Sequence, residues 1–230
     1  ELSSKGNREL ALQVRSDEVH ALLAGMFHAD WVDVAYLPFV LNDYRPAAPH
    51  VLISEVLYDP LGLDDKEFVE LVNPTPFSID LSGYALGDAV QGDDFEDVRR
   101  FPDGTVISPS QTIVVAFAGT AFEAEFGFLP DFEIVETNTA VSNLIDDPAW
   151  GDPAALFQLG NGGDEIILRD AQDRVVDVLV YGAGQFGAVV PCPAVTASGH
   201  SLERFPFDQD RDDCARDFRD WPIPNPGALP

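Results

Sequence analysis

The acidic run from Asp208 to Asp213 is the segment whose residue types and spacing best match a chemical role. Acids stand at Asp208, Asp210, Asp212 and Asp213. Alternating carboxylates in a loop can turn several oxygens toward one hard cation such as Ca²⁺. An EF-hand loop would have Gly after its third acid, whereas this run continues with another acid. The run therefore predicts either a calcium site made by these four aspartates or a solvated acidic turn balanced by nearby arginines.

Three glutamates, Glu55, Glu67 and Glu70, fall in or beside predicted strands, and paired carboxylates can perform acid–base or metal chemistry. Glu67 and Glu70 are three residues apart, so they face opposite sides of a regular strand and do not share a site. We expect these glutamates to make strand-end or cross-sheet hydrogen bonds. A further acidic cluster is interpreted as an exposed hairpin tip: Asp93, Asp94, Glu96 and Asp97.

Two cysteines and a tryptophan are further candidates for a site. Cys192 and Cys214 lie in one loop-rich region, and a disulfide between them would close a loop of about twenty residues and contribute ~3 kcal/mol. Such a bond would indicate an oxidising compartment. Trp150 lies in a long predicted loop, where an exposed ring could contact a ligand.

The charge of the chain excludes some classes of partner. There are 40 acidic residues against 13 basic ones, a formal net charge of −27. Phosphate backbones bind proteins through Lys and Arg, so we expect no nucleic-acid binding by this chain alone. No apolar run approaches the ~18 residues that a membrane-spanning helix needs. The apolar fraction of 46% is ample for a core.

Short strand-like runs separated by turn signals dominate the chain after residue 50. Such runs, bounded by Gly, Pro and Asn, are typical of an all-β sandwich or barrel. We predict a mainly β domain over 51–230, with an insertion at about 119–160. The predicted strands include Val51–Val56, Glu67–Val72, Thr112–Ala118, Glu165–Leu168 and Val175–Tyr181.

Residues 1–44 have a different pattern. A strand-like alternation at 10–14 precedes a helix start at Ser16, and apolar residues follow at helical spacing. The Pro-rich segment 45–50 is typical of a linker. We therefore predict a short N-terminal strand–helix appendage joined to the β domain by this linker.

Five ordered motifs in the β domain resemble the lamin-tail domain of bacterial type, over about 48–228. The first, Ile53–Asp88, contains the strands SEV and EFVEL and the hairpin DLSGYALGD. The resemblance implies an immunoglobulin-like β-sandwich without agreed catalytic residues. The other four motifs are Phe101–Phe117, Asn161–Gly182, His200–Pro206 and Ile223–Gly227.

The start of the chain resembles the C-terminal end of a phospholipase D superfamily domain. Ser3 or Ser4, with Asn7, Arg8 and Glu9, matches an element just downstream of that family's second catalytic motif. The resemblance implies that the chain is a fragment of a longer phosphodiesterase. The family's catalytic His-x-Lys pair is absent from this sequence, so we expect this chain itself not to be an enzyme.

Together these observations predict a non-catalytic accessory domain of a secreted, phospholipase D-like phosphodiesterase. The domain would tether or position the enzyme on a surface, a glycan or a protein partner, in an extracellular or cell-surface location of a bacterium. The alternatives are a structural module that forms a homodimer or packs on the upstream catalytic domain, and a metal-dependent hydrolase with Asp210 and Asp212 as ligands.

Overall fold

The structure is a computed structural model that describes residues 47–88, 90, 96–150 and 155–229. The chain divides into two units, Glu1–Pro46 and Ala47–Pro230. The described residues all belong to the second unit. The predicted appendage over 1–44 lies outside the described residues, as do residues 45 and 46 of the predicted linker over 45–50.

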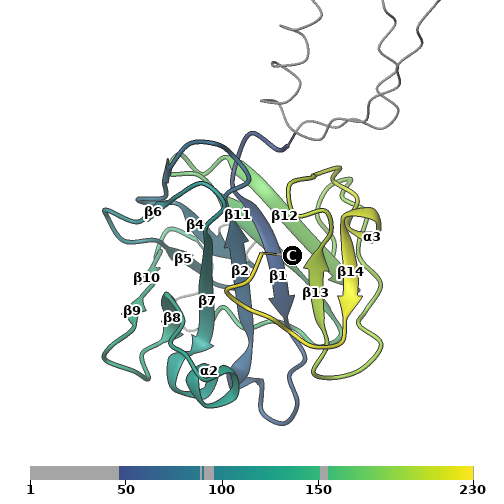
Figure 1. Cartoon of the computed structure of the whole chain (residues 1–230), viewed down its shortest axis with the longest axis horizontal. Helices are drawn as coiled ribbons and strands as arrows, with labels where there is room; N and C mark the ends of the chain where they lie inside the picture. Colours follow the sequence, from purple (N-terminus) through teal and green to yellow (C-terminus); the bar gives the residue numbers. More distant parts are fainter. Residues whose placement is uncertain (1–46, 89, 91–95, 151–154, 230) are drawn as a thin grey trace, which may run out of the picture. The chain divides into compact units, whose positions relative to one another are not determined.

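The larger sheet has seven strands in the order β14–β13–β1–β2–β7–β8–β9 (Figure 1). Neighbouring strands are antiparallel, except that β8 is parallel to both β7 and β9. In chain order its strands are β1 (Leu52–Leu57), β2 (Phe68–Val72), β7 (Thr112–Ala118), β8 (Phe132–Val135), β9 (Ser142–Asn143), β13 (Ser201–Arg204) and β14 (Phe218–Trp221).

The smaller sheet has five antiparallel strands in the order β10–β5–β4–β11–β12, and a separate strand pair, β3–β6, lies apart from both sheets. The segment predicted as an insertion supplies β8 and β9 to the larger sheet and β10 to the smaller one. These strands are β3 (Ile79–Asp80), β4 (Ala85–Gly87), β5 (Val98–Arg100), β6 (Val106–Ile107), β10 (Ile145–Asp146), β11 (Gly163–Arg169) and β12 (Val175–Gly182).

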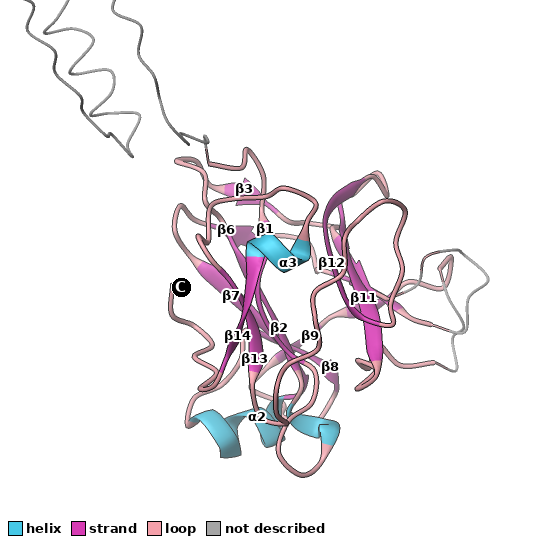
Figure 2. Cartoon of the chain, turned by 90° about the vertical axis from the view of Figure 1, so that its right-hand side faces the viewer, coloured by secondary structure: helices cyan, strands magenta, loops and turns pink. Residues whose placement is uncertain are grey.

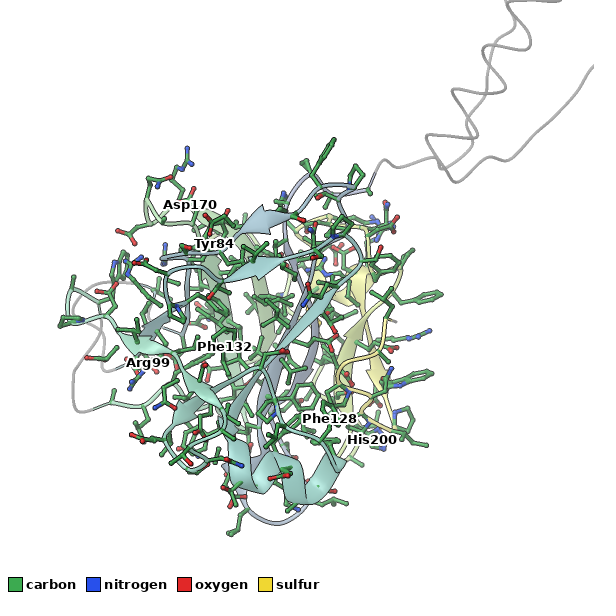
Figure 3. All side chains as sticks on the ribbon, turned by 60° about the vertical axis from the view of Figure 1, so that its left-hand side comes forward. Tyr84, Arg99, Phe128, Phe132, Asp170 and His200 are labelled. Atoms are coloured by element: carbon green, nitrogen blue, oxygen red, sulfur yellow. A yellow bond between two sulfur atoms is a disulfide. The ribbon has the colours of Figure 1, made fainter. Side chains whose placement is uncertain are left out.

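The two sheets form the layers of a sandwich (Figure 2). Val69 of β2 and Ile166 of β11 belong to one buried apolar cluster between the sheets. Phe132 of β8 packs edge-on against Phe101, with ring centroids 5.3 Å apart (Figure 3). Burial of this apolar surface is the main stabilising term of the fold. The architecture is the mainly β sandwich expected from the sequence.

In the described part of the chain, three short helices accompany the sheets: η1 (Asp64–Lys66), α2 (Gly119–Phe126) and α3 (Cys214–Asp217). Phe122 and Phe126 of α2 pack edge-on against Phe68 of β2, with centroids 5.8 and 5.5 Å away. This contact covers the outer face of β2, so the strand is buried on both faces. No helix in the described ranges is long and apolar enough to cross a bilayer.

A β-bulge between Ile53 and Glu55 changes which residues of β1 face outward. Ile53 and Val56 both belong to the core cluster, although regular alternation would pair residue 53 with residue 55 on one face. Bulges commonly re-aim a side chain in this way. Here the bulge leaves Glu55 on the outer face, directly opposite Glu70 of β2.

Candidate functional site

The predicted acidic loop surrounds a buried arginine. Arg204 is 1% exposed. Its guanidinium donates hydrogen bonds to the carbonyls of Ile53 (2.7 Å) and Gln209 (2.8 Å) and to the Asp177 carboxylate (2.7 Å). Asp210 lies 3.8 Å from the same guanidinium. Among the four acids of the loop, Asp210 is thus the one placed beside this buried cation.

The four predicted calcium ligands are not brought together. Asp210 lies 3.7 Å from His50, and this contact is the main reason that the pKa of Asp210 lies below its ordinary value. Asp213 lies 3.8 Å from Arg216, and the Asp208 carbonyl accepts the Ala48 N–H. Within the described part of the chain, no group of three or more His, Cys, Asp or Glu side chains is placed to hold a metal ion. Calcium binding at Asp208, Asp210, Asp212 and Asp213 stays a prediction.

A second group of acidic side chains binds the backbone of the segment from Ala155 to Gly160, called here the core strip. Its residues alternate between buried and exposed like those of a strand, with Phe157 and Leu159 in the core cluster. Carboxylates accept its N–H groups. Asp97 accepts from Phe157 (3.1 Å), Glu67 from Leu159 (3.1 Å) and Asp164 from Gly160 (2.7 Å).

Burial raises the pKa values of these carboxyl groups. It raises the pKa of Glu67 to about 8 and also raises the pKa values of Asp97 and Asp164. Burial likewise raises the pKa of Asp88, which accepts the Asp97 N–H at 2.9 Å. The expectation that Asp97 belongs to an exposed hairpin tip was wrong, because this residue is 1% exposed and supports the core strip.

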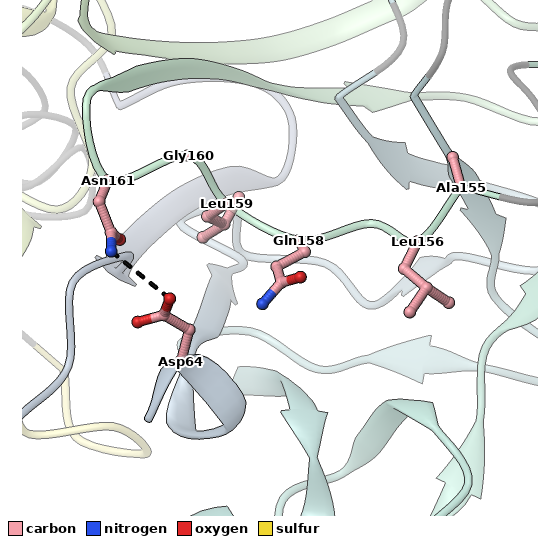
Figure 4. Close-up of a pocket in the computed structure, with 7 residues that line it drawn as sticks. All are labelled: Asp64, Ala155, Leu156, Gln158, Leu159, Gly160 and Asn161. Atoms are coloured by element: carbon pink, nitrogen blue, oxygen red, sulfur yellow. Dashed lines mark hydrogen bonds between the residues drawn. The ribbon is translucent and has the colours of Figure 1, made fainter. Parts of the chain in front are cut away.

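An open groove of about 530 Å³ lies along the exposed side of the core strip (Figure 4). The Asn161 side chain reaches across it to Asp64 at 3.5 Å. Among the described residues, Asp64 is the one titratable side chain that lines the groove. The lining residues are Asp64, Ala155, Leu156, Gln158, Leu159, Gly160 and Asn161.

The outer face of the larger sheet carries a row of three glutamates, Glu203, Glu55 and Glu70, on the neighbouring strands β13, β1 and β2. Glu203 accepts from Arg219 at 2.8 Å. Glu55 accepts from the Ser201 hydroxyl at 2.5 Å, and Glu70 from the Ser54 hydroxyl at 2.7 Å. These contacts fix the orientation of each carboxyl group.

The C-terminal tail, residues 222–229, crosses the larger sheet at β1 and β2 (Figure 1) and contacts two glutamates of this row. The Asn225 N–H donates to Glu55 at 3.1 Å, and the Gly227 N–H donates to Glu70 at 2.5 Å. Burial raises the pKa of Glu55 to about 7 and that of Glu70 to about 8. As the spacing predicted, Glu67 and Glu70 therefore serve opposite faces of the strand.

An aromatic–arginine stack stands beside the glutamate row, at the edge strand β14. The guanidinium of Arg219 lies 4.1 Å from the ring centroid of Phe205 and 4.3 Å from that of Trp221. Phe205 is 52% exposed, and Ile223, two residues beyond the stack, is 77% exposed. The Phe205 ring presents flat apolar surface to solvent beside the guanidinium of Arg219, whose charge Glu203 neutralises.

Comparison with known proteins identifies the sandwich. The family model of the Lamin Tail Domain matches residues 45–183, well over half of the chain. The chain belongs to the lamin tail domain family. Among curated proteins, none matches the chain significantly.

A solved structure supports the same fold for this lamin tail domain. A DUF4876 family protein from Bacteroides thetaiotaomicron superposes with a TM-score of 0.61 at 12% identity, covering 80% of this chain and 75% of that one. At this identity the similarity concerns the fold alone. The expected immunoglobulin-like, lamin-tail-type sandwich is thus confirmed, and such a domain is consistent with a non-catalytic binding module.

Three residues that the sequence singled out, Trp150, Cys192 and Cys214, can be placed in the lamin tail domain. Trp150 is partly buried against Ala85 and Val98, and the Arg169 guanidinium lies 4.4 Å from its ring centroid. Its role as a ligand contact stays a prediction. Cys192 and Cys214 form a disulfide, with Cα atoms 4.8 Å apart, that ties the first residue of α3 to the segment after β12.

Sequence reasoning missed the role of the C-terminal tail as a partner of the glutamate row. A signal was present in the alternation of Pro222, Pro224 and Pro226. Proline lacks an N–H, so this spacing leaves free donors only at the residues between and after the prolines. The glutamates that accept two of those donors lie more than 150 positions earlier in the chain, as the sequence separations of 170 and 157 show.

Proposed function

We propose that this lamin tail domain is a non-catalytic accessory module that tethers or positions a secreted, phospholipase D-like phosphodiesterase on a surface, a glycan or a protein partner. The observation that carries the proposal is the stack of Phe205, Arg219 and Trp221, in which the Phe205 ring is exposed. Aromatic and arginine side chains dominate the binding energy of protein interfaces. The stack therefore favours a protein partner over a glycan.

Two further features support an upstream catalytic domain and an oxidising location for this module. The match of Asn7, Arg8 and Glu9 to the downstream element of the phospholipase D superfamily supports an upstream catalytic domain. The Cys192–Cys214 disulfide supports an oxidising, extracellular or cell-surface location. The absence of His-x-Lys from the sequence assigns the catalytic step to that upstream domain and not to this chain.

The test compares the activity of the parent enzyme on surface-bound and on soluble phosphodiester substrates. Replacing both Phe205 and Trp221 by Ala is expected to lower the ratio of surface-bound to soluble activity at least tenfold. Phe77→Ala, which removes a ring that is 73% exposed elsewhere on the domain, is the matched control and should keep the ratio. A version ending at Tyr44 should behave like the double variant. If soluble turnover disappears with the domain, the module is part of the enzyme and the proposal is wrong.

The nature of the partner follows from pretreating the surface. If the partner is a protein, protease treatment of the surface should abolish the difference in surface-to-soluble activity ratio between the parent enzyme and the double variant. Loss of that difference after glycosidase treatment instead would assign a glycan.

Self-association is the second candidate function, and the position of β14 at the edge of the larger sheet favours it. An edge strand presents unpaired backbone groups that can pair with another strand. Light scattering across a concentration series would show a dimer that the Phe205 and Trp221 variants weaken.

Calcium is tested in the same preparation: a rise in melting temperature with Ca²⁺ that Asp210→Ala removes would establish the site. The hydrolase alternative needs Asp210 as a metal ligand, whereas this carboxylate lies 3.7 Å from His50 and 3.8 Å from Arg204.

A further inference from the structure

The core strip has one backbone side that is paired and one that is not. Residues 155–160 alternate between buried and exposed and contain no bend or turn, as an extended strand does. The N–H groups of Phe157 and Leu159 donate to buried carboxyl groups. Among the described residues, no hydrogen bond involves the N–H or the carbonyl of Leu156 or Gln158. The strip therefore keeps two residues with unused backbone donors and acceptors.

These unused groups belong to residues that line the groove. In an extended chain, the N–H and carbonyl of one residue point to one side, and those of the next residue point to the other. The N–H groups of Leu156 and Gln158 therefore point away from the carboxyl groups that bind their neighbours. Figure 4 shows both side chains directed toward the side of the strip on which Asp64 lies. Both residues line the groove, so a ligand lying in it meets the unpaired edge.

The unpaired edge is held in place by the core. Phe157 and Leu159 are 1% and 5% exposed and belong to the cluster between the sheets. Leu156, by contrast, is 48% exposed and offers apolar surface beside the edge. Because the strip is already ordered, a ligand that pairs with it orders only itself, which lowers the entropic cost of binding.

The groove carries a negative charge at its Asn161 end. Asp64 contacts Asn161 at 3.5 Å, which is long for a hydrogen bond. Lys66 on the same short helix does not neutralise it, because its ammonium donates to Glu125 at 2.7 Å and to the Leu61 carbonyl at 3.1 Å. In the part of the chain that the structure describes, no ion pair includes Asp64. A cationic side chain at this end of the groove would meet an acid that has no cation of its own.

The charge of the chain decides between two kinds of occupant. A second copy carries the same net charge of −27, so the approach of two copies is opposed by repulsion. A basic segment of a different protein is attracted by the same field and is matched by the free acid in the groove. Charge complementarity therefore favours a basic partner protein over a second copy.

We propose that the unpaired edge of the core strip binds an extended, basic segment of a partner protein by strand addition. The segment runs antiparallel to the strip and pairs with the N–H and carbonyl groups of Leu156 and Gln158. An Arg or Lys at its N-terminal end lies beside Asp64. In this mode of recognition, main-chain hydrogen bonds supply affinity and side-chain contacts supply selectivity. The site does not include the aromatic–arginine stack on which the proposed function rests.

The direct test titrates the ¹⁵N-labelled full chain with the capped peptide RTVTVT and follows amide chemical shifts. The largest saturable shifts are expected at Leu156 and Gln158. Asp64→Asn should weaken binding at least about threefold. Asp65→Asn removes the same charge from the same helix outside the groove and should weaken binding less than twofold. No saturable shift at millimolar peptide, or equal weakening by the two variants, overturns the proposal.

Two control peptides test the placement of the cation. QTVTVT lacks the charge and should bind more weakly than RTVTVT, with no further loss in Asp64→Asn. The reversed sequence TVTVTR places the cation at the other end and should also bind more weakly. Tighter binding of either control contradicts the proposed orientation. Replacing Phe205 and Trp221 by Ala should leave the affinity for RTVTVT unchanged, which separates this site from the aromatic–arginine stack.

Amide hydrogen exchange tests the unpaired edge without a variant. In the free chain, Leu156 and Gln158 should exchange much faster than Phe157 and Leu159, because their N–H groups have no acceptor. Saturating RTVTVT should slow exchange at Leu156 and Gln158 at least tenfold and leave Gly227 unchanged. Uniform protection along the strip in the free chain, or no slowing with the peptide, contradicts the proposal.

Discussion

The core strip and the C-terminal tail are both attached to the sandwich by backbone hydrogen bonds, but they differ in how much apolar surface they bury. Both are irregular segments that lie against the sandwich, and both donate backbone N–H groups to buried carboxyl groups. The core strip also inserts Phe157 and Leu159 between the sheets. The tail leaves its largest apolar side chain, Ile223, 77% exposed.

This difference separates a structural segment from a displaceable one. A hydrogen bond that replaces one with water contributes only about 1 kcal/mol net, whereas a buried aromatic side chain contributes several times more. The core strip should therefore leave only when the domain unfolds. The tail, held mainly by hydrogen bonds, should open on its own.

The largest effect is expected from removing the apolar anchor of the core strip. Phe157 is 1% exposed, so Phe157→Ala should lower the free energy of unfolding by about 3–5 kcal/mol. Urea denaturation of the full chain measures this loss. A loss under about 1 kcal/mol would mean that hydrogen bonds alone hold the core strip.

The pH dependence of stability tests the carboxyl anchors of both segments together. Burial raises the folded-state pKa of Glu55 to about 7 and those of Glu67 and Glu70 to about 8, above the ordinary value of 4.5. The folded state therefore binds more protons than the unfolded one between these values, and stability falls as pH rises. The melting temperature should be more than about 5 °C lower at pH 9 than at pH 5.5.

Variants separate these groups from the general repulsion of a chain of charge −27. Glu67→Gln and Glu70→Gln each remove one titrating group without removing its acceptor oxygen. Each should reduce the melting-temperature difference between the two pH values. A difference that is unchanged in both variants would show that these carboxyl groups titrate normally.

A smaller effect should distinguish the acceptor role of Glu67 from its charge. Glu67→Leu leaves the Leu159 N–H without its partner and should cost about 1–3 kcal/mol. Glu67→Gln keeps an acceptor of the same shape and should cost less than about 1 kcal/mol at pH 7, where the carboxyl group is largely protonated. Chemical denaturation of the two variants side by side gives the comparison.

The smallest effect is expected at the tail. Ile223→Ala should change the free energy of unfolding by less than about 0.5 kcal/mol, because the side chain is already exposed. Thermal unfolding measures this change. A loss comparable to that of Phe157→Ala would remove the distinction between the two segments.

Local patterns in the sequence were sufficient for the main strands. The predicted runs at 51–56, 67–72 and 112–118 correspond to β1, β2 and β7 within one residue or two. Strand periodicity and turn residues are local properties, and these strands are strongly apolar. The short strands β8, β9 and β10 were not predicted, since two to four residues carry no period and their pairing is decided by neighbours far along the chain.

The site depended on contacts that no local pattern contains. Glu67 and Leu159 are separated by 92 positions, and Glu70 and Gly227 by 157. The expected strand-end or cross-sheet hydrogen bonds are present, since Glu55 and Glu70 accept from Ser201 and Ser54 on neighbouring strands. Their additional bonds to irregular segments were not predicted. Arg204 illustrates the same limit. The sequence offered calcium or nearby arginines as the countercharge of the acidic loop, and it could not show that Arg204 of β13 would be buried beside Asp210 and Asp177.

Native-state hydrogen exchange tests the distinction between the two segments most directly. The amides of Phe157 and Leu159 are predicted to exchange only through global unfolding, with a free energy equal to that from urea denaturation. The amides of Asn225 and Gly227 should exchange through a local opening of clearly lower free energy. Tail amides protected as strongly as those of the core strip would contradict the account, because the tail would then be a fixed part of the fold.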